Sequence, residues 1–485
     1  MDFQNLTREE IEKLTETSSE LIWVLILYLW DENQKLKQEV KELKTRLNQN
    51  SNNSSKQPSS DGNKKPNPKS LRGKSGKQNG GQPGHKAHQL PLNENPDHMI
   101  TYTIDNCEKC GHDLTDTLPM KEKIRQVLDF IAEMETTEHR VQVKVCSTCK
   151  HRNQSSFPSG VDYKTQYGNG AKSVFSYLST QQLMPLKRLT ETIHSLTGHS
   201  VSQGTILRAN QELYEKLEPA EELIKQEILA SPVAHFDESS VKVNGKKKWL
   251  HVACTPKLTH YTIHKNRGSK AMDTAGILPD FEGTAMRDGW KAYRKYNKCS
   301  QALCNEHHHR ELVGVVENDQ QDWGQEKIDL LYAIKKQKED RILAGFDHME
   351  TEQIITFEKK YRTILDMGFA KNPAPPPPIE KKEGSVKQSK TKNLLDRLDQ
   401  DQSATLKFMH DFRVPFTNNE AERTIRMIKV QQEVSGSFRS EQGPIIFSRL
   451  RGYFSTIRKQ ELPELKKIQE AFAGTSFISE APSKN

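Results

Sequence analysis

The spacing of apolar residues changes several times along the 485 residues of this chain, and the first regular pattern is a heptad that begins near Leu21. Glu and Lys fill most positions between the heptad residues, as they do on the flanks of a coiled coil. We expect residues 1–50 to form a coiled-coil helix that joins copies of the chain, with Asn33 selecting register and oligomer number. A single amphipathic helix packed on its own domain is the alternative. The two apolar series are Ile22, Leu29, Leu36 and Leu43, and Ile26, Asn33, Val40 and Leu47.

Helical spacing returns between residues 165 and 230. Leu186, Leu189 and Ile193 begin one apolar face, and a second face starts at Ile206, after the turn Gly-His-Ser-Val-Ser-Gln-Gly at 198–204. A helix, a short turn bounded by glycine and a second helix outline a helix-turn-helix. Two antiparallel helices without any DNA contact give the same outline, so both alternatives stay open.

The pattern over residues 231–310 is that of strands. We expect strands at 233–243, 247–255 and 259–264, with Asn244 and Gly245 in the first turn. A helix over 269–278 and short strands at 283–287 and 301–304 follow. Three antiparallel strands followed by alternating helix and strand predict an α+β fold with helices on the faces of one sheet.

A long helical pattern separates this sheet from a later helix of the same domain, which runs through Ile425 and Ile428. Residues 311–410 are expected to be a helical insertion with a proline-rich break at 373–378, and residues 411–465 to complete the sheet domain before a tail at 466–485. The insertion residues expected to be buried are Leu330, Ile334, Ile342 and Ile355.

Two Cys-x-x-Cys pairs lie in residues 96–160, flanked by strand-like stretches at 98–104 and 139–145. Thiolates two residues apart in a tight turn can both reach one ion, and two such turns complete a tetrahedral site. We therefore expect a zinc-ribbon-like module with structural Zn²⁺, which either binds DNA or braces the fold. The alternative, two redox dithiols, lacks the βαβ setting that such motifs need. The expected ligands are Cys107, Cys110, Cys146 and Cys149.

The composition of the chain indicates what kind of partner it binds and where in the cell it is found. The chain has 72 basic and 64 acidic residues, for a net charge of +8, and the segment 51–95 holds most of that excess in a stretch rich in Asn, Ser, Gly and Pro. Too little apolar surface exists there to offset ordering entropy, so we expect a disordered basic linker that lies along phosphates or keeps the chain soluble. The apolar run at 21–30 is short of the roughly 20 residues that span a bilayer, and no basic leader precedes it. We expect a cytoplasmic, nucleoid-associated protein with no membrane contact.

Three acids stand where strands and a helix can bring them together. Asp237 lies in the middle of the first strand, Asp288 ends the fourth, and Glu422 lies on a helix that Asn418 and Asn419 can cap. Such a trio can share two Mg²⁺ or Mn²⁺ ions. Two neighbouring acids are weaker candidates, because strand alternation points Glu238 to the opposite face and helical spacing turns Glu420 elsewhere.

The segment after this helix start is basic and aromatic, and it is the candidate DNA contact. Basic side chains can hold phosphates while aromatic rings stack on unpaired bases, although core aromatics on an ordinary surface helix give the same pattern. Three consecutive histidines, His307, His308 and His309, can bind metal, contact DNA or support the second aspartate, Asp288. We favour the last of these roles. The expected DNA contacts are Arg423, Arg426, Lys429 and Arg439, and the aromatic residues are Phe438, Phe447, Tyr453 and Phe454.

Several long motifs occur in an order that resembles the transposases of the insertion-sequence 66 family over essentially the whole chain. Two of them lie in the linker, Asn-Ser-Ser-Lys-Gln-Pro-Ser-Ser-Asp-Gly at 53–62 and Gly-Gly-Gln-Pro-Gly-His-Lys at 80–86. The Cys pairs resemble the family's zinc-binding domain. His-Phe-Asp-Glu-Ser at 235–239, Asp-Gly-Trp at 288–290 and Asn-Asn-Glu-Ala-Glu-Arg at 418–423 resemble its catalytic blocks. Ser239 stands where the family commonly has Thr, and Thr417 where it commonly has Asp.

This resemblance implies a DNA transposase of the DDE type with an RNase H-like catalytic core, in which Asp237, Asp288 and Glu422 are the metal ligands. It also makes Cys304 and His307 similar to a Cys-x-x-His element of related transposases. The implied reaction cleaves the terminal inverted repeats of an element and joins them to target DNA, with companion proteins of the same element as partners. The alternatives are a metal-dependent nuclease without strand transfer and a zinc-containing DNA-binding regulator.

Overall fold

A computed structural model describes residues 19–54, 92–374 and 388–475 of the chain. The chain divides into two compact units. The larger one comprises Met1–Asn67, Ser159–Glu191 and Val201–Asn485, and the smaller one Pro68–Pro158 with Thr192–Ser200. Most of the predicted basic linker and of the proline-rich break, and the last part of the tail, lie outside the described residues.

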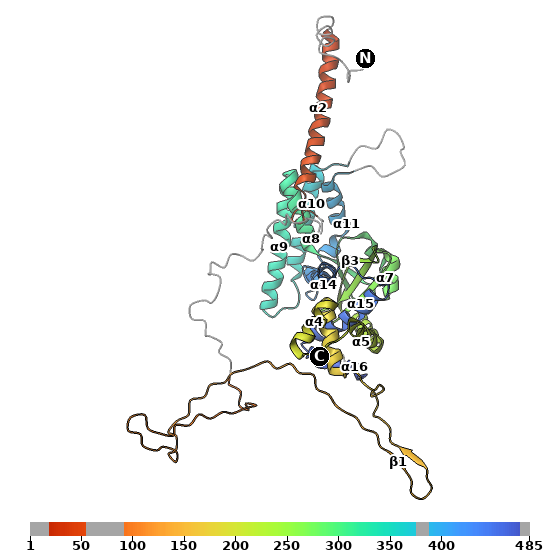
Figure 1. Ribbon diagram of the computed structural model, residues 1–485. Coiled ribbons are helices and arrows are strands. Elements are labelled where there is room, and N and C mark those ends of the chain that lie inside the picture. Colours follow the sequence, from red (N-terminus) through yellow and green to blue (C-terminus); the bar gives the residue numbers. More distant parts are fainter. Residues whose placement is uncertain (1–18, 55–91, 375–387, 476–485) are drawn as a thin grey trace, which may run out of the picture. The chain divides into compact units, whose positions relative to one another are not determined.

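The larger unit is built on a five-stranded sheet, in which Figure 1 labels β3. The strand order is β5-β4-β3-β6-β7. The first three strands in the sequence are antiparallel neighbours, whereas β6 runs parallel to β3 and β7 parallel to β6. The α+β prediction is confirmed, and each strand predicted within 231–310 is present with bounds that differ by at most one residue. The strands are β3 (Val233–Val243), β4 (Lys246–Cys254), β5 (Thr259–His264), β6 (Thr284–Arg287) and β7 (Ser300–Leu303).

The turn between β3 and β4 forms as the sequence predicts. Asn244 has φ 48° and Gly245 has φ 72°, the two positive values that a tight hairpin turn of this hand needs. Between β5 and β6 lies α7 (Ser269–Ala275), which is shorter than the predicted helix and ends where Gly276 adopts φ 68°. A short 3-10 helix, η3 (Lys291–Lys295), connects β6 to β7.

Helices cover both faces of the sheet, and the alternation of side chains along β3 decides which face each residue meets. Ala234 and Phe236 pack in a core with α5 (Gln203–Lys216), α6 (Glu218–Leu229), α15 (Gly443–Lys459) and α16 (Glu464–Phe472). Val241 and Val243 pack on the other face against α14 (Asn419–Ser435). Asp237 shares the alternation of Val241 and therefore faces α14.

A third core holds the helical insertion together beside β6 and β7. Leu330 and Ile334 are buried as predicted, but Ile342 and Ile355 are exposed, so that part of the prediction was wrong. The buried stripe of α10 passes through Tyr361 and Leu365, and Ile355 lies off this stripe. The helices are α8 (Asn305–Gly314), η4 (Val315–Asp319), α9 (Asp322–Leu343), α10 (Thr351–Lys371), α11 (Lys390–Gln400), α12 (Gln402–Thr405) and α13 (Lys407–His410).

The remaining helices follow the predicted pattern. The heptad segment is one helix, α2 (Ser19–Asn48), and α3 (Asn169–Ser176) continues into η2 (Tyr177–Gln181). The expected pair of helices is present as α4 (Leu186–Thr197) and α5, and Ser202 caps α5 by accepting the Thr205 N–H at 3.1 Å. Among the described residues no helix is long and apolar enough to span a membrane.

The smaller unit contains a two-stranded antiparallel sheet of β1 (Val143–Val145) and β2 (Arg152–Gln154). Only the end of the strand predicted at 139–145 forms, and no strand forms at 98–104. A strand needs a partner for its backbone groups, and the chain after the first Cys turn folds back only far enough to form one antiparallel bridge, between Asn106 and Asp113, which leaves 98–104 without a partner strand in the described part of the chain.

Candidate active site

Strand pairing places the first two candidate acids side by side. The parallel register of β3 and β6 pairs His235 with Met286, and Asp237 and Asp288 each lie two residues further along. Side chains two residues apart on a strand share a face, so both carboxylates lie on the side of the sheet that α14 covers. Asp288 is held in place because its Oδ1 accepts the Trp290 N–H at 2.9 Å and the Arg287 guanidinium donates to its carbonyl at 2.7 Å.

The third acid, Glu422, lies on α14, and the charges of both other acids affect the pKa of Asp237. Burial raises the pKa of Asp237 well above its usual range, and the charges of Glu238, Asp288 and Glu422 raise it further. The Glu238 N–H donates to Asp237 Oδ1 and acts in the opposite direction. The structure therefore places the three carboxylates that the sequence singled out close enough to interact electrostatically, but among the described residues their oxygens do not form a group of ligand atoms within 4.8 Å of one another.

Asn418 is the buried residue that locks the start of α14 onto the sheet. Its Nδ2 donates to the Phe236 carbonyl at 2.9 Å, and its Oδ1 lies 2.9 Å from Nδ1 of His235. Its backbone N–H donates to the Cys304 thiol at 3.2 Å. The side chain does not cap the helix, so the capping prediction was wrong for Asn418. It instead connects α14 to the two residues that precede Asp237.

Glu422 has a second set of neighbours at the start of α8. The Cys304 thiol lies 3.8 Å from Glu422 Oε1, and Nδ1 of His307 lies 3.7 Å from the same oxygen. Ligand atoms of these three residues lie within 4.8 Å of one another. Burial raises the pKa of the Cys304 thiol to about 12, and the pKa of His307 is lowered, mainly by burial. Both groups are therefore held in their neutral forms beside the carboxylate.

The three histidines of the run have different surroundings. Nδ1 of His307 lies 3.7 Å from Glu422, and the charges of Glu422 and Asp288 both raise the pKa of His307 against the larger effect of burial. His308 is fully buried, with its pKa lowered to about 3 by burial, and neither ring nitrogen has a hydrogen-bond partner in the described residues. His309 lies 3.6 Å from Glu306 and packs edge-on against Tyr332. A helix turns successive residues by about 100°, which separates the three rings.

Glu238 occupies the opposite face, as strand alternation predicts. Arg267 donates to its Oε1 at 2.9 and 2.7 Å, and the Tyr293 hydroxyl donates to its Oε2 at 2.7 Å. The Arg267 guanidinium lies over the rings of Trp290 and Trp249. Burial and the charge of Asp288 raise the pKa of Glu238 to about 7. With its oxygens engaged in this way, Glu238 is a structural group that braces the sheet beneath the site.

The two Cys pairs adopt the same turn. The Cys107 N–H donates to the His112 carbonyl and the Cys146 N–H to the His151 carbonyl, both at 2.8 Å. Backbone N–H groups at the second cysteine and the residue before it lower the pKa of Cys107, and similar bonds lower that of Cys146 to about 7. Each turn thus favours a thiolate. Among the described residues, the four sulfurs do not gather into one group of ligands.

The basic residues of the C-terminal helices divide into two classes. Arg423, Arg426 and Arg439 are exposed, whereas the Lys429 ammonium donates to the carbonyl and hydroxyl of Ser240. The aromatic residues divide as well. Tyr453 and Phe454 are buried in the core and Phe438 packs on Phe447, so the core alternative holds for the first two.

Comparison with known proteins identifies two regions of the chain. Residues 164–444, more than half of the sequence, match the model of a family described as "Transposase IS66 family". Residues 3–91 match a family of unknown function, DUF6444. No curated protein matches the chain. The transposase match contains Asp237, Asp288 and Glu422 together with Cys304 and Asn418.

Proposed function

Because the chain belongs to the IS66 family of transposases, we propose that Asp237, Asp288 and Glu422 form a DDE catalytic site that cleaves element ends and joins them to target DNA. The observation that carries this proposal is the convergence of three carboxylates, two from neighbouring parallel strands and one from the helix across them.

The order and direction of the strands support an RNase H-like core. Three antiparallel strands lie at one side of the sheet, and two further strands run parallel to the first of them. The first aspartate is on the central strand β3 and the second follows its parallel neighbour β6. The insertion from α8 to α13 then enters between the second and third acids, where it adds its own core without interrupting the sheet.

The three acids fit divalent cations that prefer oxygen ligands. Burial and like charges raise the pKa of Asp237, and a cation among the carboxylates would offset the charge that causes this shift. Asp237, Asp288 and Glu422 would hold two Mg²⁺ or Mn²⁺ ions. When bound, such ions activate an attacking oxygen and stabilise a leaving one in phosphoryl transfer.

The residues around the carboxylates orient them. Asn418 fixes the start of α14 against β3, and we assign Cys304 and His307 to positioning Glu422. Thiol and imidazole groups are poor ligands for Mg²⁺, so this pair does not enlarge the magnesium site. Arg423, Arg426, Lys429 and Arg439 would hold DNA phosphates near the cleaved end, with the three exposed arginines better placed than Lys429.

We assign the remaining regions the roles expected from their sequences. Cys107, Cys110, Cys146 and Cys149 would bind structural Zn²⁺ through the two thiolate-favouring turns. Helices α4 and α5 would contact terminal repeats, and α2 would join copies of the chain. Companion proteins of the same element complete the set of proposed partners.

The replacement Asp288→Asn tests the assignment. It preserves the shape of the side chain and its bond to the Trp290 N–H but removes a carboxylate ligand. We expect binding to labelled element ends to persist while cleavage falls at least about a thousandfold, as for loss of an essential group. Cleavage at the wild-type rate would refute the site. Cleavage without any joined product in the wild-type protein would instead support a nuclease that lacks strand transfer.

A further inference from the structure

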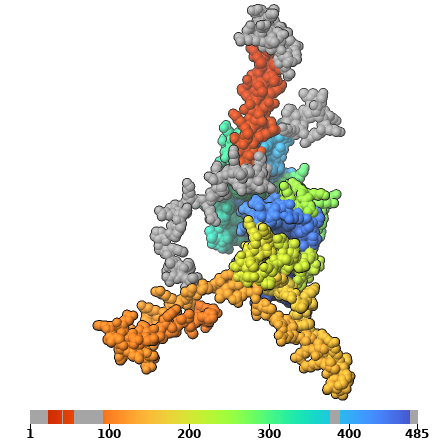
Figure 2. Space-filling model, viewed as in Figure 1, coloured from red at the N-terminus to blue at the C-terminus, as the bar shows by residue number. Residues whose placement is uncertain are grey.

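The helix α2 carries an apolar face that the rest of the described chain leaves open. Figure 2 shows its side chains, in red, at the surface along the helix. If Asn33 and Val40 are given the heptad position a, Leu36 and Leu43 take position d, and all four are exposed. Leu36 is 57% exposed and Leu43 56% exposed. An exposed a/d face of this length is the contact surface of a coiled coil.

The residues that flank this face specify how a second helix would lie on it. Glu32 and Glu39 occupy position g, and Lys37 and Lys44 occupy position e. In a parallel coiled coil, each g residue faces the e residue five positions later on the other helix. Glu32 therefore faces Lys37 of a second copy, and Glu39 faces Lys44. An antiparallel arrangement would instead set glutamate against glutamate and lysine against lysine.

The polar residue within the face agrees with this arrangement. Asn33 lies at position a and is exposed in the single chain. In a parallel, in-register pair the two Asn33 amides meet and can bond each other, which favours this register over neighbouring ones. Both the charged flanks and the core amide thus select the same pairing, a second copy of α2 in the same direction.

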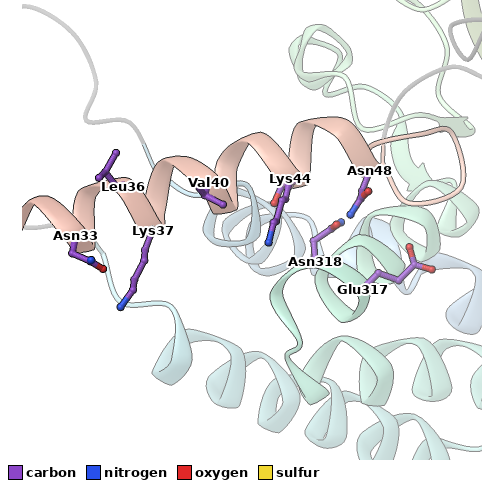
Figure 3. A pocket seen from close by; sticks show the side chains of 9 residues that line it. Asn33, Leu36, Lys37, Val40, Lys44, Asn48, Glu317 and Asn318 are labelled. Carbon is purple, nitrogen blue, oxygen red and sulfur yellow. The ribbon is translucent and has the colours of Figure 1, made fainter.

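The same face borders a groove of about 540 Å³ between α2 and η4 (Figure 3). In Figure 3 the side chains of Lys37 and Lys44 extend from α2 toward the side on which Asn318 lies, whereas Leu36 points to the other side. The groove is therefore adjacent to the e edge of the heptad face, where the g glutamates of a second helix would reach. Its lining residues are Asn33, Leu36, Lys37, Val40, Lys44, Thr45, Asn48, Glu317 and Asn318.

The groove has a fixed wall because the end of α2 is fastened to the insertion. Asn53 Nδ2 donates to the Asn48 carbonyl at 2.9 Å and to Glu317 Oε2 at 3.1 Å, and Ser51, Asn53 and Ser54 are buried. A Cβ on Gly314 would lie 2.4 Å from the Asn53 carbonyl oxygen, so glycine is what permits this close approach. These contacts hold the C-terminal end of α2 at a fixed position beside η4.

We infer that a second copy of this chain pairs its α2 with the first in parallel and in register, closing the groove beside η4. This deepens the self-association proposed above and rests on it. The pair would be held by Glu32 to Lys37 and Glu39 to Lys44 contacts on both sides of the seam. Both catalytic units would then lie at the same end of the coiled coil.

Disulfide trapping tests direction and register. Leu36→Cys places two thiols across the seam, whereas Lys35→Cys places them on the outer side of the helix, which is also exposed. Under mild oxidation we expect covalent dimers from Leu36→Cys above the background that the seven native cysteines give, and none above background from Lys35→Cys. Equal yields from the two variants would overturn the inference.

Charge exchange tests the flanking pairs. The double variant Lys37→Glu/Lys44→Glu, and separately Glu32→Lys/Glu39→Lys, should weaken self-association by at least about tenfold at low salt, measured by sedimentation. Mixing the two variants should restore association, because each g to e contact again joins opposite charges. Association of either variant alone at the wild-type strength would overturn the inference.

Hydrogen exchange tests closure of the groove. The backbone of η4 should exchange more slowly in wild-type dimers than in the Lys37→Glu/Lys44→Glu protein, and the same rate in both would show that the second helix does not reach this wall. The Asp288→Asn protein should self-associate as the wild type does. Loss of cleavage and loss of pairing are thereby separate results.

Discussion

Replacing Asn418 by Ala tests whether one buried amide holds the catalytic helix in place. The change removes the bonds to His235 and to the Phe236 carbonyl and leaves both partners buried. Each buried polar group left without a partner costs about 1–3 kcal/mol, so we expect a loss of roughly 2–4 kcal/mol of unfolding free energy. For a unit of this size the melting temperature should fall by about 2–5 °C.

The same change should impair catalysis more than DNA binding. Glu422 follows Asn418 by one helical turn, and a shift of about 1 Å in a catalytic group can cost on the order of a hundredfold in rate. Cleavage of labelled element ends should therefore fall at least about tenfold at a temperature where the variant is folded, while end binding persists. Circular dichroism measures the melting temperature, and gel assays measure cleavage and binding.

Asn419→Ala is the matched control, because Asn419 is the adjacent amide and is exposed. It should change the unfolding free energy by less than about 0.5 kcal/mol. If the Asn418 and Asn419 variants melt together and cleave equally, the positioning role of Asn418 is wrong.

Three further changes probe other parts of the chain. Cys146→Ser should release zinc from zinc-replete protein and destabilise residues 96–160, and an unchanged zinc content by elemental analysis would contradict the proposed ligand. Burial, followed by Lys225 and Arg449, lowers the pKa of His260 to about 3, so only the unfolded chain gains a proton as the pH falls from about 6.5. The stability that neutral His260 contributes is complete above that pH and is lost toward pH 3 by up to about 1.4 kcal/mol per pH unit. The unfolding free energy of His260→Gln, measured by denaturant titration, should therefore decline less steeply between about pH 6.5 and pH 4 than that of the wild type. Arg426→Ala should weaken binding to element ends and lower the slope of log K against log salt by about 1, whereas Arg458→Ala, whose guanidinium already pairs with Glu464, should leave that slope unchanged.

The sheet and its two aspartates could be predicted from sequence because their signals are local. The Asn244–Gly245 turn fixes the hairpin, and alternation along β3 sorts Asp237 from Glu238 before any contact is known. The register that sets Asp237 beside Asp288 is a long-range property, yet it follows once β6 is parallel to β3.

The roles of other residues depend on tertiary contacts, which rules based on neighbouring residues in the sequence cannot predict. The capping rule considers only the helix that follows Asn418, whereas the folded chain offers its side chain two partners on β3. Ile355 looks buried in a helical pattern, but the stripe of α10 that meets the insertion core is set by Tyr361 and Leu365. Cys304 was visible as part of a Cys-x-x-His motif, but its contact with Asn418 depends on tertiary packing.

The position of Glu422 in the sequence has a consequence for synthesis of the chain. Strand pairing can assemble Asp237 and Asp288 as soon as β7 has left the ribosome, but α14 emerges only after the entire insertion. A nascent or prematurely terminated chain thus possesses α4 and α5, which are proposed to contact the terminal repeats, while it lacks the third acid and the basic residues that follow it. Such fragments would occupy element ends without cutting them, and in a cell they would compete with the complete protein.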